Sequence, residues 1–150
     1  MNEKLKQRLH YTLQIPMYRV DELLTICQRI IHPKSELINA NGQVFDRLGY
    51  IIEGAARIYY LNEDGEEVSY LLQVNGDAIG DYYSYLTGEP SQVRIEMLLK
   101  TEVLYFKKED IDRLSQQDVF WLALSKRISD LAFLSAKRRI DELFFYTPEQ

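Results

Sequence analysis

The sequence is poor in the residues that build redox-active and metal-dependent sites. Its single cysteine, Cys27, excludes an intrachain disulfide and any cluster that needs several thiolates. Its two histidines, His10 and His32, precede the segments expected to be strands, which argues against a metalloenzyme whose ligands converge inside a β-barrel. Neither a G-x-S-x-G elbow nor a G-x-x-x-x-G-K loop is present. We therefore expect no bound metal and no enzymatic activity, with haem ligation by either histidine left open.

Long apolar runs and an excess of positive charge are missing as well. No run of 18 apolar residues exists, and the first residues lack the apolar core of a signal peptide, which predicts a cytoplasmic protein without a membrane partner. The net charge of −5 has the wrong sign for a chain whose whole surface grips phosphate backbones. DNA is therefore expected as a partner only through another part of the protein. Seven glycines and four prolines argue against repeats, and 150 residues suit one domain.

Apolar residues recur at helical spacing in the first region. They are Val20, Leu23, Leu24, Cys27, Ile30 and Ile31. This spacing predicts a helix that runs to about residue 32 and is ended by Pro33. Because Cys27 lies on the apolar face, we interpret it as a small buried residue.

The middle region, about 34–107, changes to short β-forming runs separated by turns. The runs include 50–52, 56–61 and 68–72, and the turns are Asn41-Gly42, Glu53-Gly54, Asp64-Gly65 and Asn75-Gly76. Asp64-Gly65 predicts a hairpin, because these residues tolerate the positive φ of a tight turn. Several short strands at this spacing predict an all-β sandwich or roll.

The third region, about 107–146, returns to helical spacing. A short helix is predicted near Glu109 to Leu114, followed by a long helix with Asp118 as its N-cap. One face of the long helix carries Phe120, Leu124, Ile128, Leu131 and Leu134, and a nearly opposite face carries Ala132, Ala136, Ile140, Leu143 and Phe144. Such a helix needs two covering surfaces, for which we expect the roll of its own chain and a second copy of the helix. The candidate dimer contacts are Phe120, Leu124, Ile128, Leu131 and Ser135. A helix in an ordinary core is the alternative.

The last four residues have the features of a helix start. Thr147 is a good N-cap, Pro148 suits the first helical position, and Gln150 completes a capping box. We therefore expect a further domain after Gln150. The predicted organisation is a β-roll with N-terminal helices at 1–117, a dimerisation and connector helix at 118–146, and the start of a DNA-binding domain at 147–150.

These three regions, in this order, resemble the Crp/Fnr superfamily of transcription regulators. The resemblance is strongest over residues 49–106, where Gly54 precedes a basic and apolar strand, Asp64-Gly65 marks a hairpin, and 75–81 reads NGDAIGD. In the family the last run opens the phosphate-binding cassette. The resemblance implies an α+β, mainly β fold, a double-stranded β-helix or jelly roll of the cyclic-nucleotide-binding type. It also implies a homodimer that reaches DNA through a C-terminal helix-turn-helix domain.

The cassette departs from the nucleotide-binding members at one position of consequence. Gly80 and Asp81 correspond to the Gly-Glu pair of those members. The glycine allows a ligand close to the backbone, and the carboxylate accepts a hydrogen bond from the ribose hydroxyl. Ten residues later those members have Arg followed by Ser or Thr, where this chain has Ser91 and Gln92. Losing the charge-assisted contact costs about 1.5–3 kcal/mol. If Ser91 points inward, strand alternation turns Arg94 outward. Binding of cAMP or cGMP in the usual manner is therefore not expected.

Tyrosines crowd the cassette and the neighbouring strands. Aromatic walls with hydroxyl tips suit a small, partly apolar effector, and the alternative is that the rings simply fill the roll. The candidate ligand residues are Gly80, Asp81, Tyr82, Tyr83, Ser91, Gln92, Arg94 and Tyr70. A cyclic nucleotide or another small effector is the candidate ligand. We predict an effector-sensing and dimerisation domain of a Crp/Fnr-like regulator, and a free-standing ligand-binding or interaction module is the alternative.

Overall fold

The computed structural model describes residues 3–39 and 42–145, except for the side chains of residues 69, 70, 135, 139 and 143. The chain divides into two compact units, Met1–Lys108 and Glu109–Gln150. Several predicted features lie outside the described residues: the side chains of Tyr70, Ser135 and Leu143, Asn41 of the Asn41-Gly42 turn, and the segment 147–150. The predicted domain boundaries differ from this division by several residues and stay a prediction.

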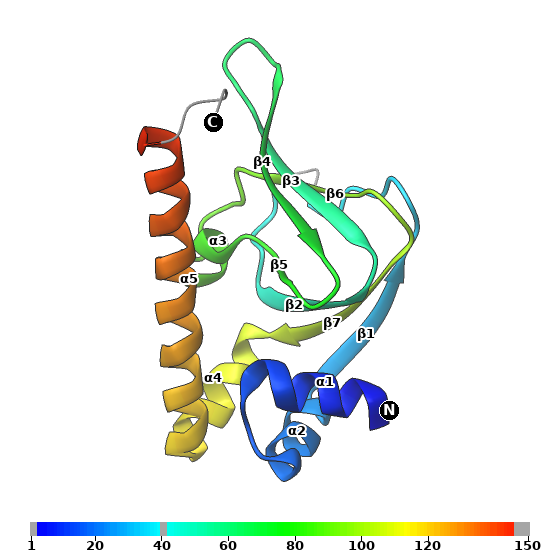
Figure 1. The fold of residues 1–150 in the computed structure, drawn as a ribbon, viewed down its shortest axis with the longest axis vertical. Helices are drawn as coiled ribbons and strands as arrows, with labels where there is room; N and C mark the ends of the chain where they lie inside the picture. Colours follow the sequence, from blue (N-terminus) through cyan, green and yellow to red (C-terminus); the bar gives the residue numbers. More distant parts are fainter. Residues whose placement is uncertain (1–2, 40–41, 146–150) are drawn as a thin grey trace. The chain divides into compact units, whose positions relative to one another are not determined.

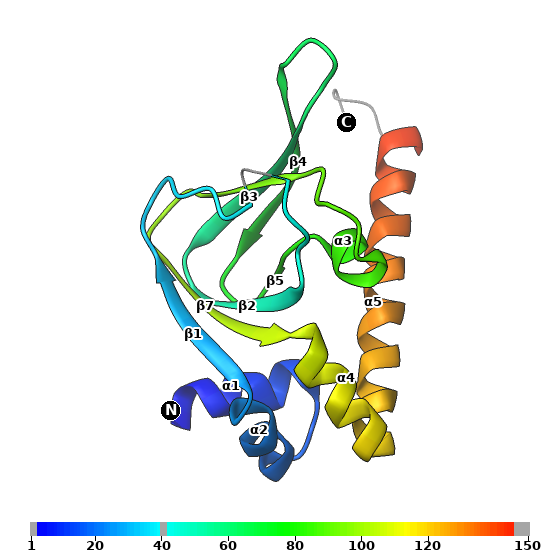
Figure 2. The ribbon, with the colours of Figure 1, turned by 180° about the vertical axis from the view of Figure 1, so that it is seen from behind.

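Two antiparallel sheets form the first unit (Figures 1 and 2). The four-stranded sheet has the order β1-β7-β2-β5 and the three-stranded sheet the order β4-β3-β6. Their bounds are β1 Cys27–His32, β2 Arg47–Glu53, β3 Ala55–Leu61, β4 Glu67–Val74, β5 Ala78–Ile79, β6 Arg94–Met97 and β7 Thr101–Lys107. The predicted α+β, mainly β roll is confirmed.

The core of the roll lies between the two sheets, because alternate residues of each strand point inward. In β6, for example, Ile95 and Met97 are buried while Arg94 and Glu96 are half-buried. The core consists of Phe45, Ile51, Ala56, Ile58, Ile79, Val93, Ile95, Met97, Val103 and Tyr105. These side chains fill the space between the two sheets.

Two helices precede the sheets, α1 Glu3–Leu13 and α2 Met17–Leu24. The prediction of one helix running to residue 32 is wrong, because Cys27–His32 is β1 and pairs with β7 along its whole length. Helical spacing and β-branched residues compete in this segment, and ladder pairing decides the outcome. Cys27 is only half-buried, and its thiol donates a hydrogen bond to Leu24 O.

The turns follow the predicted glycines. β3 and β4 form the predicted hairpin, with Gly65 at φ +78° in a wider loop than a two-residue turn. The Asn62 carboxamide oxygen organises that loop by accepting from the backbone N–H groups of Asp64 and Glu66. The hairpin extends from the end of the roll opposite α1 and α2 (Figures 1 and 2).

The second unit consists of α4 Lys108–Gln117, whose first residue belongs to the first unit, and α5 Val119–Phe145. Asp118 caps α5 as predicted, since its carboxylate accepts from the Phe120 N–H at 2.9 Å. The first turns of α5 bury Trp121 and Leu124, whereas Leu131 is 60% exposed. Among the residues described, no helix is long and apolar enough to span a bilayer.

Candidate functional site

The segment that resembles the cassette follows β5 and ends in a short helix. Gly80 adopts φ +144°, and α3 occupies Tyr82–Thr87. Asp81 is the N-cap of α3, because one of its carboxylate oxygens accepts from the Ser84 N–H at 3.2 Å. The helix ends at Gly88, which adopts the left-handed conformation. The backbone N–H of Ser84 at the start of α3 therefore already donates to the carboxylate of Asp81.

The Phe45 ring covers Gly80, the residue expected to allow a ligand close to the backbone. A Cβ placed on Gly80 would lie 2.5 Å from Cε1 of Phe45, so the glycine is needed for this ring rather than left open. The Phe45 N–H donates to the Ser84 hydroxyl at 2.8 Å, and that hydroxyl donates to Glu89 O at 2.6 Å. Phe45 is therefore held both by the hydrogen bond of its backbone N–H and by the packing of its ring against Gly80.

Ser91 and Asp81, the two residues that stand where nucleotide-binding members have Arg and Glu, bind each other. The Ser91 hydroxyl donates to the second Asp81 carboxylate oxygen at 2.8 Å. Ser91 is buried and Asp81 is half-buried. The two side chains expected to face a ligand therefore satisfy one another.

Asn39 fastens the same segment to the loop before β2. Its amide nitrogen donates to the Ser91 hydroxyl at 2.9 Å and to Val93 O at 2.6 Å, and its carbonyl oxygen accepts from Ile95 N at 2.8 Å. Asn39 is 4% exposed. Sequence reasoning missed this residue, because its partners lie more than 50 residues away.

Arg94 and Gln92 do not join this cluster. Val93, Ile95 and Met97 are buried, so alternation in β6 places Arg94 on the opposite face. Gln92 is exposed. Arg57, on the same outer face as Arg94, is held by Glu67 at 2.6 Å and Glu96 at 2.9 Å. These two hydrogen bonds raise the pKa of Arg57 and keep its guanidinium out of the roll.

The tyrosines of the cassette split between the core and the surface. Tyr82 stacks on Tyr85 with ring centroids 5.8 Å apart, and Tyr85 is buried. Tyr83 is 61% exposed. Among the three, Tyr83 is the side chain that faces solvent, and the predicted aromatic wall is not assembled from them.

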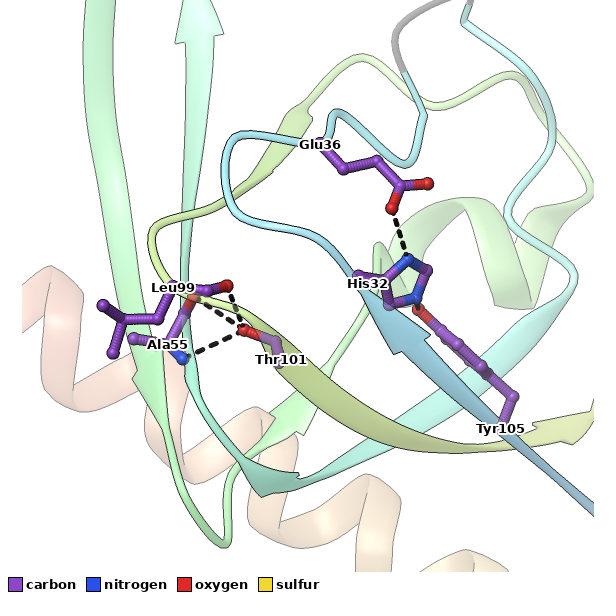
Figure 3. Close-up of polar contacts among 6 residues, drawn as sticks. All are labelled: His32, Glu36, Ala55, Leu99, Thr101 and Tyr105. Carbon is purple, nitrogen blue, oxygen red and sulfur yellow. Dashed lines mark hydrogen bonds and ion pairs between the residues drawn. The ribbon is translucent and has the colours of Figure 1, made fainter.

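A polar cluster that the sequence did not reveal surrounds His32, the last residue of β1. His32 is buried between two partners (Figure 3): Nδ1 lies 3.0 Å from Glu36 Oε2, and Nε2 lies 2.7 Å from the Tyr105 hydroxyl. Burial raises the pKa of Tyr105 well above its usual value. With its hydrogen-bonding capacity used by these partners, His32 is placed as a structural residue rather than a metal or haem ligand. The described residues contain no group of three His, Cys, Asp or Glu side chains suited to a metal ion.

Thr101 performs a similar structural task where β7 begins. Its hydroxyl bridges Leu99 O at 2.8 Å and the backbone of Ala55 at 3.2 Å (Figure 3). A Cβ on Gly54 would lie 2.3 Å from this hydroxyl, so the predicted glycine before β3 serves the close packing of β7.

A two-sheet roll with a glycine and a carboxylate before a short helix matches one known family. The profile for the cyclic nucleotide-binding domain matches residues 29–118. The chain belongs to this family. Its members regulate other domains rather than carry out catalysis. No curated protein matches the sequence.

Solved structures of the family have the same fold. A cyclic nucleotide-binding domain from Methylobacillus flagellatus KT aligns with a TM-score of 0.81 and 16% identity, over 98% of this chain and 85% of that one. The Thermus thermophilus catabolite activator protein aligns with a TM-score of 0.74 and 21% identity, over 92% of this chain. The sensor domain of the Pseudomonas aeruginosa transcriptional regulator DNR aligns with a TM-score of 0.69 and 19% identity, over 95% of this chain and 94% of that one.

The resemblance to Crp/Fnr-type regulators is therefore confirmed for the fold. The chain spans 63% of the length of the Thermus protein, so it matches part of a longer regulator there. In the cyclic nucleotide-binding domain described here, the cassette keeps its glycine, its carboxylate and its short helix. Ser91, which the sequence resemblance predicts at the arginine position of nucleotide-binding members, donates a hydrogen bond to Asp81.

Proposed function

We propose that this domain is the effector-sensing and dimerisation part of a Crp/Fnr-like transcription regulator. The family, and the regulators among its structural neighbours, support the class. DNA would be contacted by a C-terminal helix-turn-helix domain, in agreement with the net charge of −5 on these residues.

The apolar surface of α5 carries the proposal. A helix exposed to water normally presents a polar outer face, yet α5 exposes several large apolar side chains. They are Val119, Leu122, Leu131, Phe133, Leu134, Ile140, Phe144 and Phe145. A second copy of α5, paired about a two-fold axis, would cover those on one face, which include the predicted contact Leu131, whereas the predicted contact Leu124 is already buried.

The closed cassette argues that a cyclic nucleotide is not held in the usual manner. A cyclic phosphate would meet the Asp81 carboxylate without Arg57 or Arg94 to neutralise it, since both arginines lie on the outer face. A different small effector would have to displace the Phe45 ring. The predicted ligand residues, Gly80 and Asp81 among them, stay proposals for that effector.

The proposed mechanism is a change in helix packing. An effector that contacts the roll differently in two arrangements of α5 would shift the balance between them. Each arrangement would aim the attached DNA-binding domains differently.

Sedimentation velocity on the chain and on two matched variants tests the dimer. We expect the wild type to sediment as a dimer at micromolar concentration, and Leu131→Glu to sediment as a monomer because a carboxylate at a buried contact is unpaired. Leu99→Glu is the control, since Leu99 is similarly exposed, at 54%, but lies in the first unit. A monomeric wild type would contradict the proposal and favour a free-standing ligand-binding or interaction module.

A further inference from the structure

A cavity of about 390 Å³ opens on the first unit, away from the cassette. α1 contributes Lys4 and Arg8, β1 contributes Arg29, and the paired ends of β2 and β7 contribute Glu53 and Glu102. None of its lining residues belongs to the segment 80–91. Its size is at the lower end of the range for small-ligand sites. The site is thus separate from the proposed sensing function.

Two of the three cations in this cavity keep an unneutralised charge. Arg29 pairs with Glu102 across β1 and β7, so those charges offset each other. Arg8 donates to a neutral acceptor, Ile52 O, at 3.0 Å, which fixes the guanidinium but leaves its charge. Lys4 is exposed and makes no ion pair with any residue that the structure describes.

The position of these two cations does not serve the stability of α1. Lys4 and Arg8 are four residues apart on one helix, where like charges repel each other. Lys4 also lies in the first turn, where the helix dipole disfavours a cation. A local excess of positive charge in a chain of net charge −5 therefore needs another reason.

One carboxylate in the cavity limits what can enter. Glu53 lies directly opposite Glu102 in the β2–β7 ladder, and like charges so placed repel each other. Arg29 offsets Glu102, whereas Glu53 has no cationic partner among the described residues. An anion would bind Lys4 and Arg8 against this repulsion, so removing the Glu53 charge should strengthen its binding.

We propose that this cavity binds a small organic or inorganic anion, with a carboxylate or phosphate group between Lys4 and Arg8. The guanidinium of Arg8 is already oriented by Ile52 O, and Lys4 supplies a flexible second charge. The small volume and the polar lining suit a metabolite with one or two acid groups rather than a macromolecule.

Amide-detected NMR titrations with succinate and with inorganic phosphate test the site. We expect saturable shifts at the backbone amides of Arg8, Arg29 and Glu53 with at least one probe, and the probe that saturates distinguishes carboxylate from phosphate. Lys4→Gln should weaken binding by about two- to fivefold, the range for one partly screened charge. Glu53→Gln should strengthen binding by a similar factor, about two- to fivefold.

Lys34→Gln is the matched control, because Lys34 is exposed and does not line the cavity. It should leave both affinities unchanged. The proposal is overturned if neither probe gives saturable shifts at these amides, or if Lys4→Gln and Glu53→Gln bind like the control. Lys4 and Glu53 are exposed at the cavity rim, so neither substitution threatens folding, and a one-dimensional spectrum of each variant verifies this.

Discussion

The Ser91 hydroxyl donates a 2.8 Å hydrogen bond to the carboxylate of Asp81, ten residues earlier in the chain. The sequence resemblance predicts these as the two positions at which nucleotide-binding members of the family have oppositely charged ligand residues. Here a serine hydroxyl donates to a carboxylate, so both groups have a hydrogen-bond partner within the protein. We expect both the stability and the ligand preference of the domain to depend on this pair.

Cyclic nucleotides are expected not to stabilise the domain. A ligand present at 100 times its dissociation constant would add about 2.7 kcal/mol to the free energy of unfolding and raise the melting temperature. We expect no such rise in a thermal shift assay with about 1 mM cAMP or cGMP. Saturable stabilisation by either nucleotide would refute the inference drawn from Ser91.

Asp81→Ala should destabilise the domain. The substitution removes the cap of α3 and the shorter hydrogen bond of the buried Ser91 hydroxyl, which keeps only Val93 O as an acceptor at 3.2 Å, at a combined cost of about 1–3 kcal/mol. Asp81→Asn keeps an oxygen for the Ser84 N–H and should cost less. Urea unfolding measures both, with Glu63→Ala in the exposed hairpin as the control. Equal stability of Asp81→Ala and the control would show that the pair contributes little.

Gly80→Ala should be more harmful than Gly65→Ala, although both glycines have positive φ. At Gly65 the new methyl group meets open space, whereas at Gly80 it would lie 2.5 Å from the Phe45 ring. We expect the Gly80 variant to lose about 1–3 kcal/mol more, measured by chemical unfolding. Adding Phe45→Leu should recover part of the loss, and no recovery would mean that the ring is not the obstacle.

Stability should fall in alkaline solution because of Tyr105. Its pKa in the folded state is raised above the ordinary value of 10.0 by burial, so the unfolded state releases the phenolic proton first. The full contribution is present below pH 10.0 and is lost as the pH rises above it. Urea unfolding between about pH 8 and pH 11 should show a decline that is smaller in Tyr105→Phe.

The same variant has a second expected effect at neutral pH. Tyr105→Phe removes the partner of the buried His32 Nε2, which should cost about 1–3 kcal/mol. Tyr83→Phe is the control, because Tyr83 is 61% exposed and should change neither the stability nor its pH dependence. An alkaline decline as steep in Tyr105→Phe as in the wild type would assign the effect to other groups.

Much of the fold was predictable because local signals and the final structure agree. Asp64-Gly65 marked the hairpin, and Asp118 marked the start of α5, since turns and caps are chosen by the residues that form them. The alternation from Ser91 to Arg94 was also predictable, because side chains in a strand alternate between faces.

Predictions from the sequence were wrong or incomplete where contacts between distant residues determine the structure. Cys27–His32 has helical spacing in isolation, and only pairing with β7, whose partner residues lie 69 to 79 positions later, makes it a strand. Phe45 over Gly80 and Asn39 beside Ser91 could not be found from spacing, because nothing in their own neighbourhoods distinguishes them. The predicted cassette residues stay a prediction as ligand residues, and the contact between Ser91 and Asp81 depends on these long-range contacts.

The hydrogen bond made by Asn39 allows the motion of its loop to be followed by hydrogen exchange. The backbone N–H of Ile95 donates to the side chain of Asn39, 56 residues earlier. We expect this amide proton to exchange with deuterated water only when the loop that bears Asn39 lifts away. The exchange rate of the Ile95 amide would thus report how often the loop that bears Asn39 moves away, with or without an effector.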